Sequence, residues 1–229
     1  MDQVTISPKK TTTLLVALAI AMGLLNIVSF VPLLRGTRDV PIYMLNLDAE
    51  QSIPALFSTV LLWLCAIFAA FIARSDPGKR SYRLKWGGIA LAFFFLGIDE
   101  ALCFHERLNG IFLRDSGILT LGWTLPYAVL AIVFAISYLR FLGEIPKETR
   151  NLIIIAGSLY VCGSLVVEVI GGRLRAGGIE GIGYHSMVAM EELLEMSGAI
   201  VFIHAFSSYI DKHLPNFHLG ISSTIPTEE

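Results

Sequence analysis

The sequence predicts an all-α membrane protein, a single bundle of six transmembrane helices, on three observations. The chain of 229 residues is 55% hydrophobic and 16% charged, and its mean hydropathy of +0.68 is too high for a water-soluble domain. Its apolar residues lie in long runs. Six of these runs are long enough to cross about 30 Å of hydrocarbon at about 1.5 Å per residue.

The predicted spans leave only short loops between them, so residues 1–229 are expected to form one transmembrane domain. The spans are Leu14–Leu34, Ile53–Ala73, Trp86–Glu106, Trp123–Leu142, Asn151–Gly172 and Tyr184–Ile210. The first apolar run is too long for a signal peptide and no small-residue cleavage site follows it, so it is interpreted as a membrane helix. Short termini, residues 1–13 and 211–229, lie outside the bundle.

The basic residues are unequally divided between the two sides of this topology. Eleven Lys and Arg fall on the side of the termini and six on the other. Because cytoplasmic loops carry the excess of Lys and Arg, both termini are predicted to be cytoplasmic.

Three of the spans are interpreted mainly as scaffold. The first and fourth are almost entirely apolar, and Pro126 near the start of the fourth is tolerated in a first turn. The second is predicted to begin with Ser52 as N-cap and Pro54 in the first turn. Glu50, just before it, is interpreted as an acid that favours the helix dipole.

The third, fifth and sixth spans carry acids and histidines inside apolar sequence. Asp99, Glu100, His105 and Glu106 lie in the third, and Glu168 in the fifth. The sixth adds His185, Glu191, Glu192 and Glu195, which fit within about a third of a helix circumference. Ionisable side chains at membrane depth are rare and mark functional sites. His204, His213 and His218 are interpreted as structural or solvated.

In the predicted topology all of these groups fall in the outer half of the membrane, where one site could hold them. Acids crowded on an apolar helix repel each other unless protons, arginines or metal ions neutralise them. Carboxylates with one or two imidazoles suit iron, manganese or zinc, and ligands from separate helices could hold two ions. The predicted metal ligands are Asp99, Glu100, His105, Glu106, Glu168, His185, Glu191, Glu192 and Glu195.

Two features limit this assignment. The Glu-x-x-His pair of soluble di-iron bundles is missing. Without a metal, two or three of the acids should be protonated at neutral pH and could relay protons.

The Gly-rich segment Gly171–Gly183 matches no phosphate-binding fingerprint, so it is interpreted as a mobile external loop and no nucleotide cofactor is expected.

The motifs D-E-x4-H-E (Asp99–Glu106) and E-E-x2-E (Glu191–Glu195), with the Glu50–Pro54 entry and the Glu168–Gly172 segment, resemble a family of multi-pass bacterial membrane proteins of uncharacterised function. The resemblance covers roughly residues 47–210. It implies that these positions act as one unit and that the protein lies in a bacterial inner membrane. It implies no activity.

Two classes of function therefore remain, beside a purely structural polar core. One is a membrane metalloenzyme acting on a lipid, quinone or other apolar small molecule that enters sideways. The other is an ion- or proton-coupled transporter, whose site would be expected near the midplane. Because both acid clusters fall on one side of the membrane, the enzyme or metal-binding protein is favoured. Membrane lipid is an expected partner and nucleic acid is not. The sequence identifies no reaction, substrate or catalytic residue.

Overall fold

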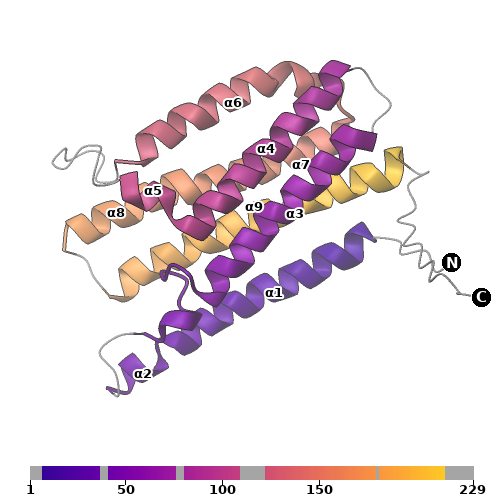
Figure 1. Ribbon diagram of the computed structural model, residues 1–229. Helices are drawn as coiled ribbons and strands as arrows, with labels where there is room; N and C mark the ends of the chain where they lie inside the picture. The colour runs from indigo at the N-terminus through magenta and orange to yellow at the C-terminus, as the bar shows by residue number, and fades with distance from the viewer. Residues whose placement is uncertain (1–6, 37–40, 76–79, 109–121, 179–180, 215–229) are drawn as a thin grey trace, which may run out of the picture.

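The computed structural model describes residues 7–36, 41–75, 80–108, 122–178 and 181–214, and all regular secondary structure in these ranges is helical (Figure 1). The elements are α1 (Pro8–Ser29), α2 (Val31–Leu34), η1 (Tyr43–Leu45), α3 (Ile53–Ser75), α4 (Arg80–Leu102), α5 (Phe104–Leu108), α6 (Thr124–Glu144), α7 (Lys147–Val161), η2 (Cys162–Val167), α8 (Glu168–Ala176) and α9 (Ile182–His213). The segment η2 is π-helical and joins α7 to α8 in one continuous rod.

Within the described residues, five helical stretches are long and apolar enough to cross a membrane. They are Pro8–Ser29, Ile53–Ser75, Thr124–Glu144, Lys147–Ala176 and Gly183–His213. The protein is therefore an α-helical, multi-pass membrane protein. The helix α4 is not among the five, because Arg80, Arg83 and Lys85 lie at its start and two acids at its end. It nevertheless has the same length as α3, 23 residues, and packs along it (Figure 1).

The long helix α9 occupies the centre of the bundle. It contacts α1, α3, α7, η2 and α8, whereas α6 lies at the edge and packs mainly on α4 and α7 (Figure 1). The apolar side chains of α6, among them Leu130, Val133 and Ile136, are exposed, as expected of a helix that faces lipid. Side chains on α9 can thus contact side chains from most of the other helices.

Several helix ends differ from the prediction. The helix α1 begins at Pro8 rather than Leu14, with proline at the first position, where its missing N–H costs nothing. The prediction that an external loop begins at Gly171 was wrong: the helix continues to Ala176, because glycine inside a helix costs only about 1 kcal/mol and packing overrides it. The N-cap prediction for Ser52 is confirmed, since its Oγ accepts the Ala55 N–H at 3.3 Å.

The predicted continuous helix Trp86–Glu106 was also wrong. The chain leaves the helix at Cys103, where φ is +52°, and restarts as α5. The Asp99 carboxylate accepts the backbone N–H of His105 at 3.1 Å, so it satisfies one of the free donors at the start of α5. The break folds His105 back over the end of α4.

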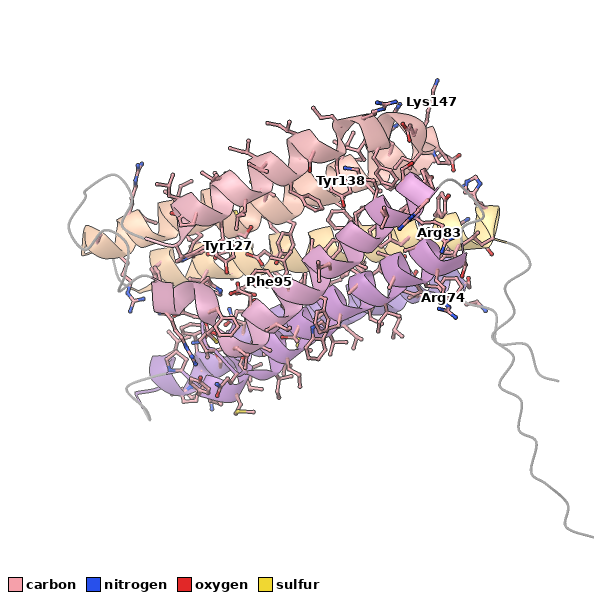
Figure 2. All side chains as sticks on the ribbon, turned by 45° about the horizontal axis from the view of Figure 1, so that its top comes forward. Arg74, Arg83, Phe95, Tyr127, Tyr138 and Lys147 are labelled. Carbon is pink, nitrogen blue, oxygen red and sulfur yellow. The ribbon has the colours of Figure 1, made fainter. Side chains whose placement is uncertain are left out.

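Aromatic side chains fill the half of the bundle that lies at the basic end. Trp86 is fully buried and packs edge-on against Phe141 and Phe206, with ring centroids 5.5 and 5.4 Å apart. Phe93 meets Phe202 at 4.8 Å. These rings join α4, α6 and α9 into a dry layer. Figure 2 places Arg74, Arg83 and Lys147 at this end and Tyr127 toward the other. The acids lie on the far side of the aromatic layer.

Candidate carboxylate site

Two glycines let the helix that carries Glu191, Glu192 and Glu195 approach the α7–η2 rod very closely. A Cβ atom on Gly163 would lie 2.8 Å from the Glu191 carbonyl oxygen and 2.9 Å from Cγ of Glu195. A Cβ on Gly198 would lie 2.8 Å from the carbonyl oxygen of Ala156. Close backbone contact through small residues is the usual way membrane helices pack. The acids of α9 are therefore held directly against η2, a π-helical segment of the kind often found at functional sites.

Glu192 and Glu195 form the inner part of the site. The Tyr160 hydroxyl donates a hydrogen bond to the Glu195 carboxylate. The main electrostatic neighbours of Glu192 are the carboxylates of Glu100, Glu195, Glu50 and Glu168. Carboxylates from α4, α8, α9 and the segment before α3 thus converge on one region.

Glu50 belongs to this region, although the sequence favoured only a helix-dipole role for it. Its carboxylate interacts with the charges of Glu100 and Glu192, and it contacts the Cys103 thiol at the break after α4. Glu50 lies in the turn that leads to Ser52. The irregular loop, not a helix face, directs it inward, so helical periodicity could not reveal it.

Glu168 and Glu191 form a carboxyl–carboxyl pair at the edge of the same region. Their side chains are hydrogen-bonded to each other. This contact links α8 to α9 at the edge of the carboxylate region. As the sequence predicted, Glu168 points into the bundle.

Asp99 is committed to a separate local network. It is 5% exposed and accepts hydrogen bonds from His105 Nδ1 at 3.0 Å and the Tyr127 hydroxyl at 2.8 Å, besides the His105 backbone N–H. The His105 ring also packs on Trp123, with centroids 4.9 Å apart. This network fixes α5 and the start of α6 over the end of α4, beside the carboxylates.

His105, on α5 beyond the end of α4, is held in its charged form. Burial lowers the pKa of His105, but the hydrogen bond and charge of Asp99, with the charges of Glu100 and Glu50, outweigh it and raise the pKa from 6.5 to about 9. At neutral pH the His105 imidazolium therefore offsets part of the negative charge of the site.

The remaining predicted ligands lie apart from this centre or are only partly described. His185 lies nearer the end of α9, where its Nδ1 is 3.9 Å from an Asp48 oxygen and its ring packs on Phe30. Tyr184 donates a hydrogen bond to the same Asp48 carboxylate at 3.0 Å. Glu106 lies on α5, and its side chain is outside the described part of the structure. The structure does not bring His185 into the group around Glu192.

A small cavity adjoins the inner end of the site. It has a volume of about 10 Å³ and is lined by Ser58, Tyr160 and Glu195 together with apolar groups. The Ser58 side chain is 7% exposed, and its Oγ has no hydrogen-bond partner among the described residues. The cavity is about the size of one water molecule, and Ser58 and Glu195 would provide polar partners for it.

The carboxylates lie near enough for their charges to interact, but they do not form a ready-made set of metal ligands. Among the described residues, no three His, Cys, Asp or Glu side chains lie close enough together to hold a metal ion. Side-chain rotation would have to draw Glu50, Glu100, Glu192 and Glu195 inward for a cation to bind all four. The arrangement can therefore bind protons as it stands and a metal ion after local closure.

The His105–Asp99 pair predicts a pH dependence of stability. The raised pKa of His105 means that this stabilisation is fully present below about pH 6.5 and is lost as the pH rises through about 9. The loss should be at most on the order of 3 kcal/mol. Melting temperatures of detergent-purified protein, measured with a chelator from pH 6 to 10, should fall over this range. His105→Gln should flatten the curve, and an unchanged slope in that variant would contradict the assignment.

Comparison with known proteins identifies the chain only at the level of a family. A family model described as "Domain of unknown function (DUF8692)" matches residues 12–210, and the chain belongs to this family. The match covers every span and every predicted site residue. No curated protein and no solved structure matched the chain.

Proposed function

We propose that this member of the DUF8692 family is a membrane protein that binds a divalent metal ion between the buried carboxylates of Glu50, Glu100, Glu192 and Glu195. One observation carries the proposal: the strongest electrostatic neighbours of Glu192 are four other carboxylates. His105, the cation acting on Glu195, is already hydrogen-bonded to Asp99. Buried charges of one sign need a counter-ion, and a divalent cation neutralises two carboxylates at once.

The donor set favours iron, manganese or zinc. Carboxylate oxygens bind all three, and contributions from separate elements are typical of carboxylate metal sites in helical bundles. Glu168, Glu191, Asp99 and His105 would lie around the ion without binding it directly. A bound ion would lower the pKa of a coordinated water and so supply a nucleophile or a Lewis acid.

The layered interior supports a one-sided site over a path across the membrane. The rings of Trp86, Phe93 and Phe206 fill the bundle below the acids. An apolar small molecule or lipid would approach sideways through the membrane, as expected for a membrane metalloenzyme.

The finer topology belongs to the same proposal. We propose that α4 is a sixth span, that both termini are cytoplasmic and that the membrane is a bacterial inner membrane, so that the acids face outward. A reporter fused after Glu229 should be active in the cytoplasm. A cysteine replacing Gly178 should react with an impermeant maleimide from outside, in a background without native cysteines. The opposite labelling would place the acids on the cytoplasmic side.

Elemental analysis of the purified protein tests the metal proposal. Protein expressed with iron, manganese and zinc supplied and passed through size exclusion should retain one or two equivalents of one of them per chain. Glu144→Gln is a matched control, because Glu144 is an exposed acid that pairs only with Arg140 in the described ion pairs. Retention below a tenth of an equivalent in both proteins would contradict metal binding.

The alternative of a proton-coupled transporter is favoured by one specific contact. Glu168 and Glu191 are hydrogen-bonded to each other, and intramembrane carboxyl pairs serve as proton relays in transporters. If this reading holds, reconstituted protein should show substrate-dependent proton flux that Glu191→Gln abolishes. The wild-type protein should show this proton flux without bound metal.

A further inference from the structure

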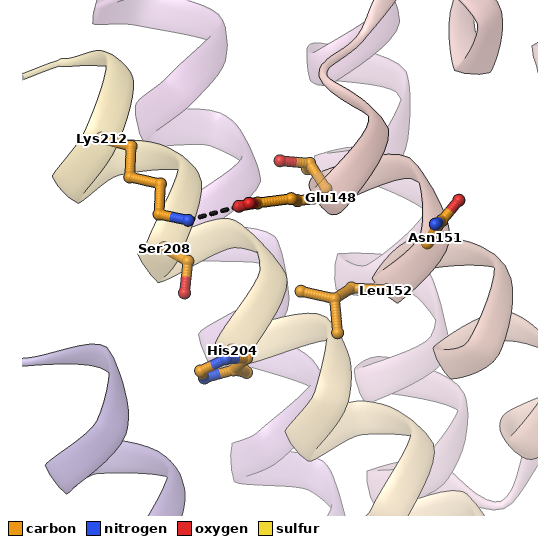
Figure 3. Close-up of a pocket in the computed structure, with 7 residues that line it drawn as sticks. Glu148, Asn151, Leu152, His204, Ser208 and Lys212 are labelled. Atoms are coloured by element: carbon orange, nitrogen blue, oxygen red, sulfur yellow. Dashed lines mark hydrogen bonds and ion pairs between the residues drawn. The ribbon is translucent and has the colours of Figure 1, made fainter.

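A polar groove lies at the other end of the bundle, beyond the aromatic layer. It has a volume of about 360 Å³ and lies between the start of α7 and the last turns of α9 (Figure 3). Its lining side chains are Glu148, Thr149, Asn151, Leu152, His204, Ser208 and Lys212. This is the size of a small-molecule site. Nothing in the carboxylate site uses these residues.

The groove runs from the end of α9 toward the middle of the membrane. His204, Ser208 and Lys212 recur every four residues, so they lie on one face of the helix, as Figure 3 shows. Eight residues of helix correspond to about 12 Å. The groove therefore reaches from headgroup level, at Lys212, into the depth of the acyl chains, at His204.

Its deep end is polar and fixed by α1. The Thr12 hydroxyl donates its hydrogen to the Pro8 carbonyl at 2.8 Å and lies 2.8 Å from Nδ1 of His204. Because that hydroxyl hydrogen is already used, Nδ1 of His204 must donate to Thr12. In the neutral ring Nε2 is then an acceptor for water or a ligand hydroxyl. The contact with Thr12 thus orients the imidazole, in keeping with a structural role for His204.

The mouth of the groove carries one charge of each sign. Lys212 and Glu148 form an ion pair across it (Figure 3), with side chains 55% and 76% exposed. Such exposed pairs contribute little to stability. A ligand with its own positive and negative groups could therefore replace the pair at little cost.

We propose that this groove binds the headgroup of a zwitterionic phospholipid of the ethanolamine type. The phosphate would accept hydrogen bonds from Lys212 Nζ and the Ser208 hydroxyl, and the ammonium would pair with Glu148. The groove opens at the basic end of the bundle, where lipid headgroups lie, and Leu152 gives it an apolar wall. Basic pockets between transmembrane helices bind anionic lipid headgroups. Here Glu148 lies beside Lys212, so the groove suits a headgroup that carries both charges.

Native mass spectrometry of the full-length protein tests this proposal. Protein in detergent would be mixed with equal amounts of phosphatidylethanolamine and phosphatidylglycerol of the same acyl chains. We expect the wild type to retain phosphatidylethanolamine at least fivefold over phosphatidylglycerol. Glu148→Gln should lose that preference but keep the binding of both lipids. Lys212→Gln and Ser208→Ala should weaken both, and Glu144→Gln should match the wild type.

A second arm distinguishes a lipid from a soluble phosphate ligand. Free phosphoethanolamine at millimolar concentration should not displace the lipid, because it lacks the glycerol and acyl groups that hold the lipid beside the groove. Displacement would overturn the lipid assignment in favour of a soluble ligand. Equal retention of the two lipids by the wild type, or wild-type retention by both Lys212→Gln and Ser208→Ala, would overturn the site itself.

Discussion

Replacing Glu192 with Gln is expected to reduce bound metal at least tenfold. The change keeps the volume of the side chain but removes the charge that four neighbouring carboxylates surround. Because an ion that binds only the folded state stabilises it by mass action, the metal-loaded melting temperature should fall with the metal content. In chelator the metal-dependent difference between the two proteins should disappear. Elemental analysis and thermal melts with and without chelator measure both effects.

The matched control for this experiment is Glu144→Gln, which removes one exposed carboxylate from the same protein. It should change neither metal content nor either melting temperature. If Glu192→Gln kept full metal content, the ion would lie elsewhere. If it were less stable than the wild type in chelator as well, the carboxylate would have a structural role that the electrostatics do not explain.

Replacing Gly163 with Ala is expected to destabilise the bundle, in contrast to the control substitution Gly87→Ala. The new Cβ would lie 2.8 Å from a backbone oxygen of α9 and 3.2 Å from the Glu195 nitrogen. Backbone atoms cannot rotate away, so α9 must shift from η2, at a cost of about 1 to 3 kcal/mol. The shift should also separate Glu195 from Tyr160 and lower the affinity for metal.

Gly87→Ala provides the control for that change. Gly87 lies inside α4, and a Cβ there would have no neighbour within 4 Å. Alanine should be neutral or stabilising at this position, by up to about 1 kcal/mol, because it is the better helix former. Equal melting temperatures for the two variants would show that α9 does not press on η2 as described.

Most of the helical architecture could be predicted from the sequence, because long apolar runs have one physical solution in a membrane. The ends could not. Cys103 interrupts the third helix through a left-handed backbone conformation, which the hydrogen bonds from His105 to Asp99 stabilise. The residue types around Cys103 do not predict that break in the helix. The break brings the side chains of His105 and Asp99 together.

The site could be predicted only in outline, for a similar reason. Glu100, Glu192 and Glu195 stand out because acids are costly in apolar helices. Glu50 and Tyr160 do not: Glu50 lies in a loop, where acids are common, and a tyrosine in a membrane helix carries no charge. Their roles depend on long-range contacts, with Cys103 and with Glu195. Sequence periodicity also could not separate Asp99 and His185 from the central carboxylates.

X-ray absorption at the edge of the bound metal tests the central claim most directly. Wild-type protein loaded with one equivalent of zinc should show a first shell of oxygen ligands at about 2.0 to 2.2 Å, with carboxylate carbons in the second shell. Glu192→Gln, mixed with zinc in the same way, should retain at most about a tenth as much, so the carboxylate signal should fall with the bound zinc. A shell made of water alone, or a spectrum identical in the wild type and Glu192→Gln, would contradict the proposal that these buried carboxylates hold the ion.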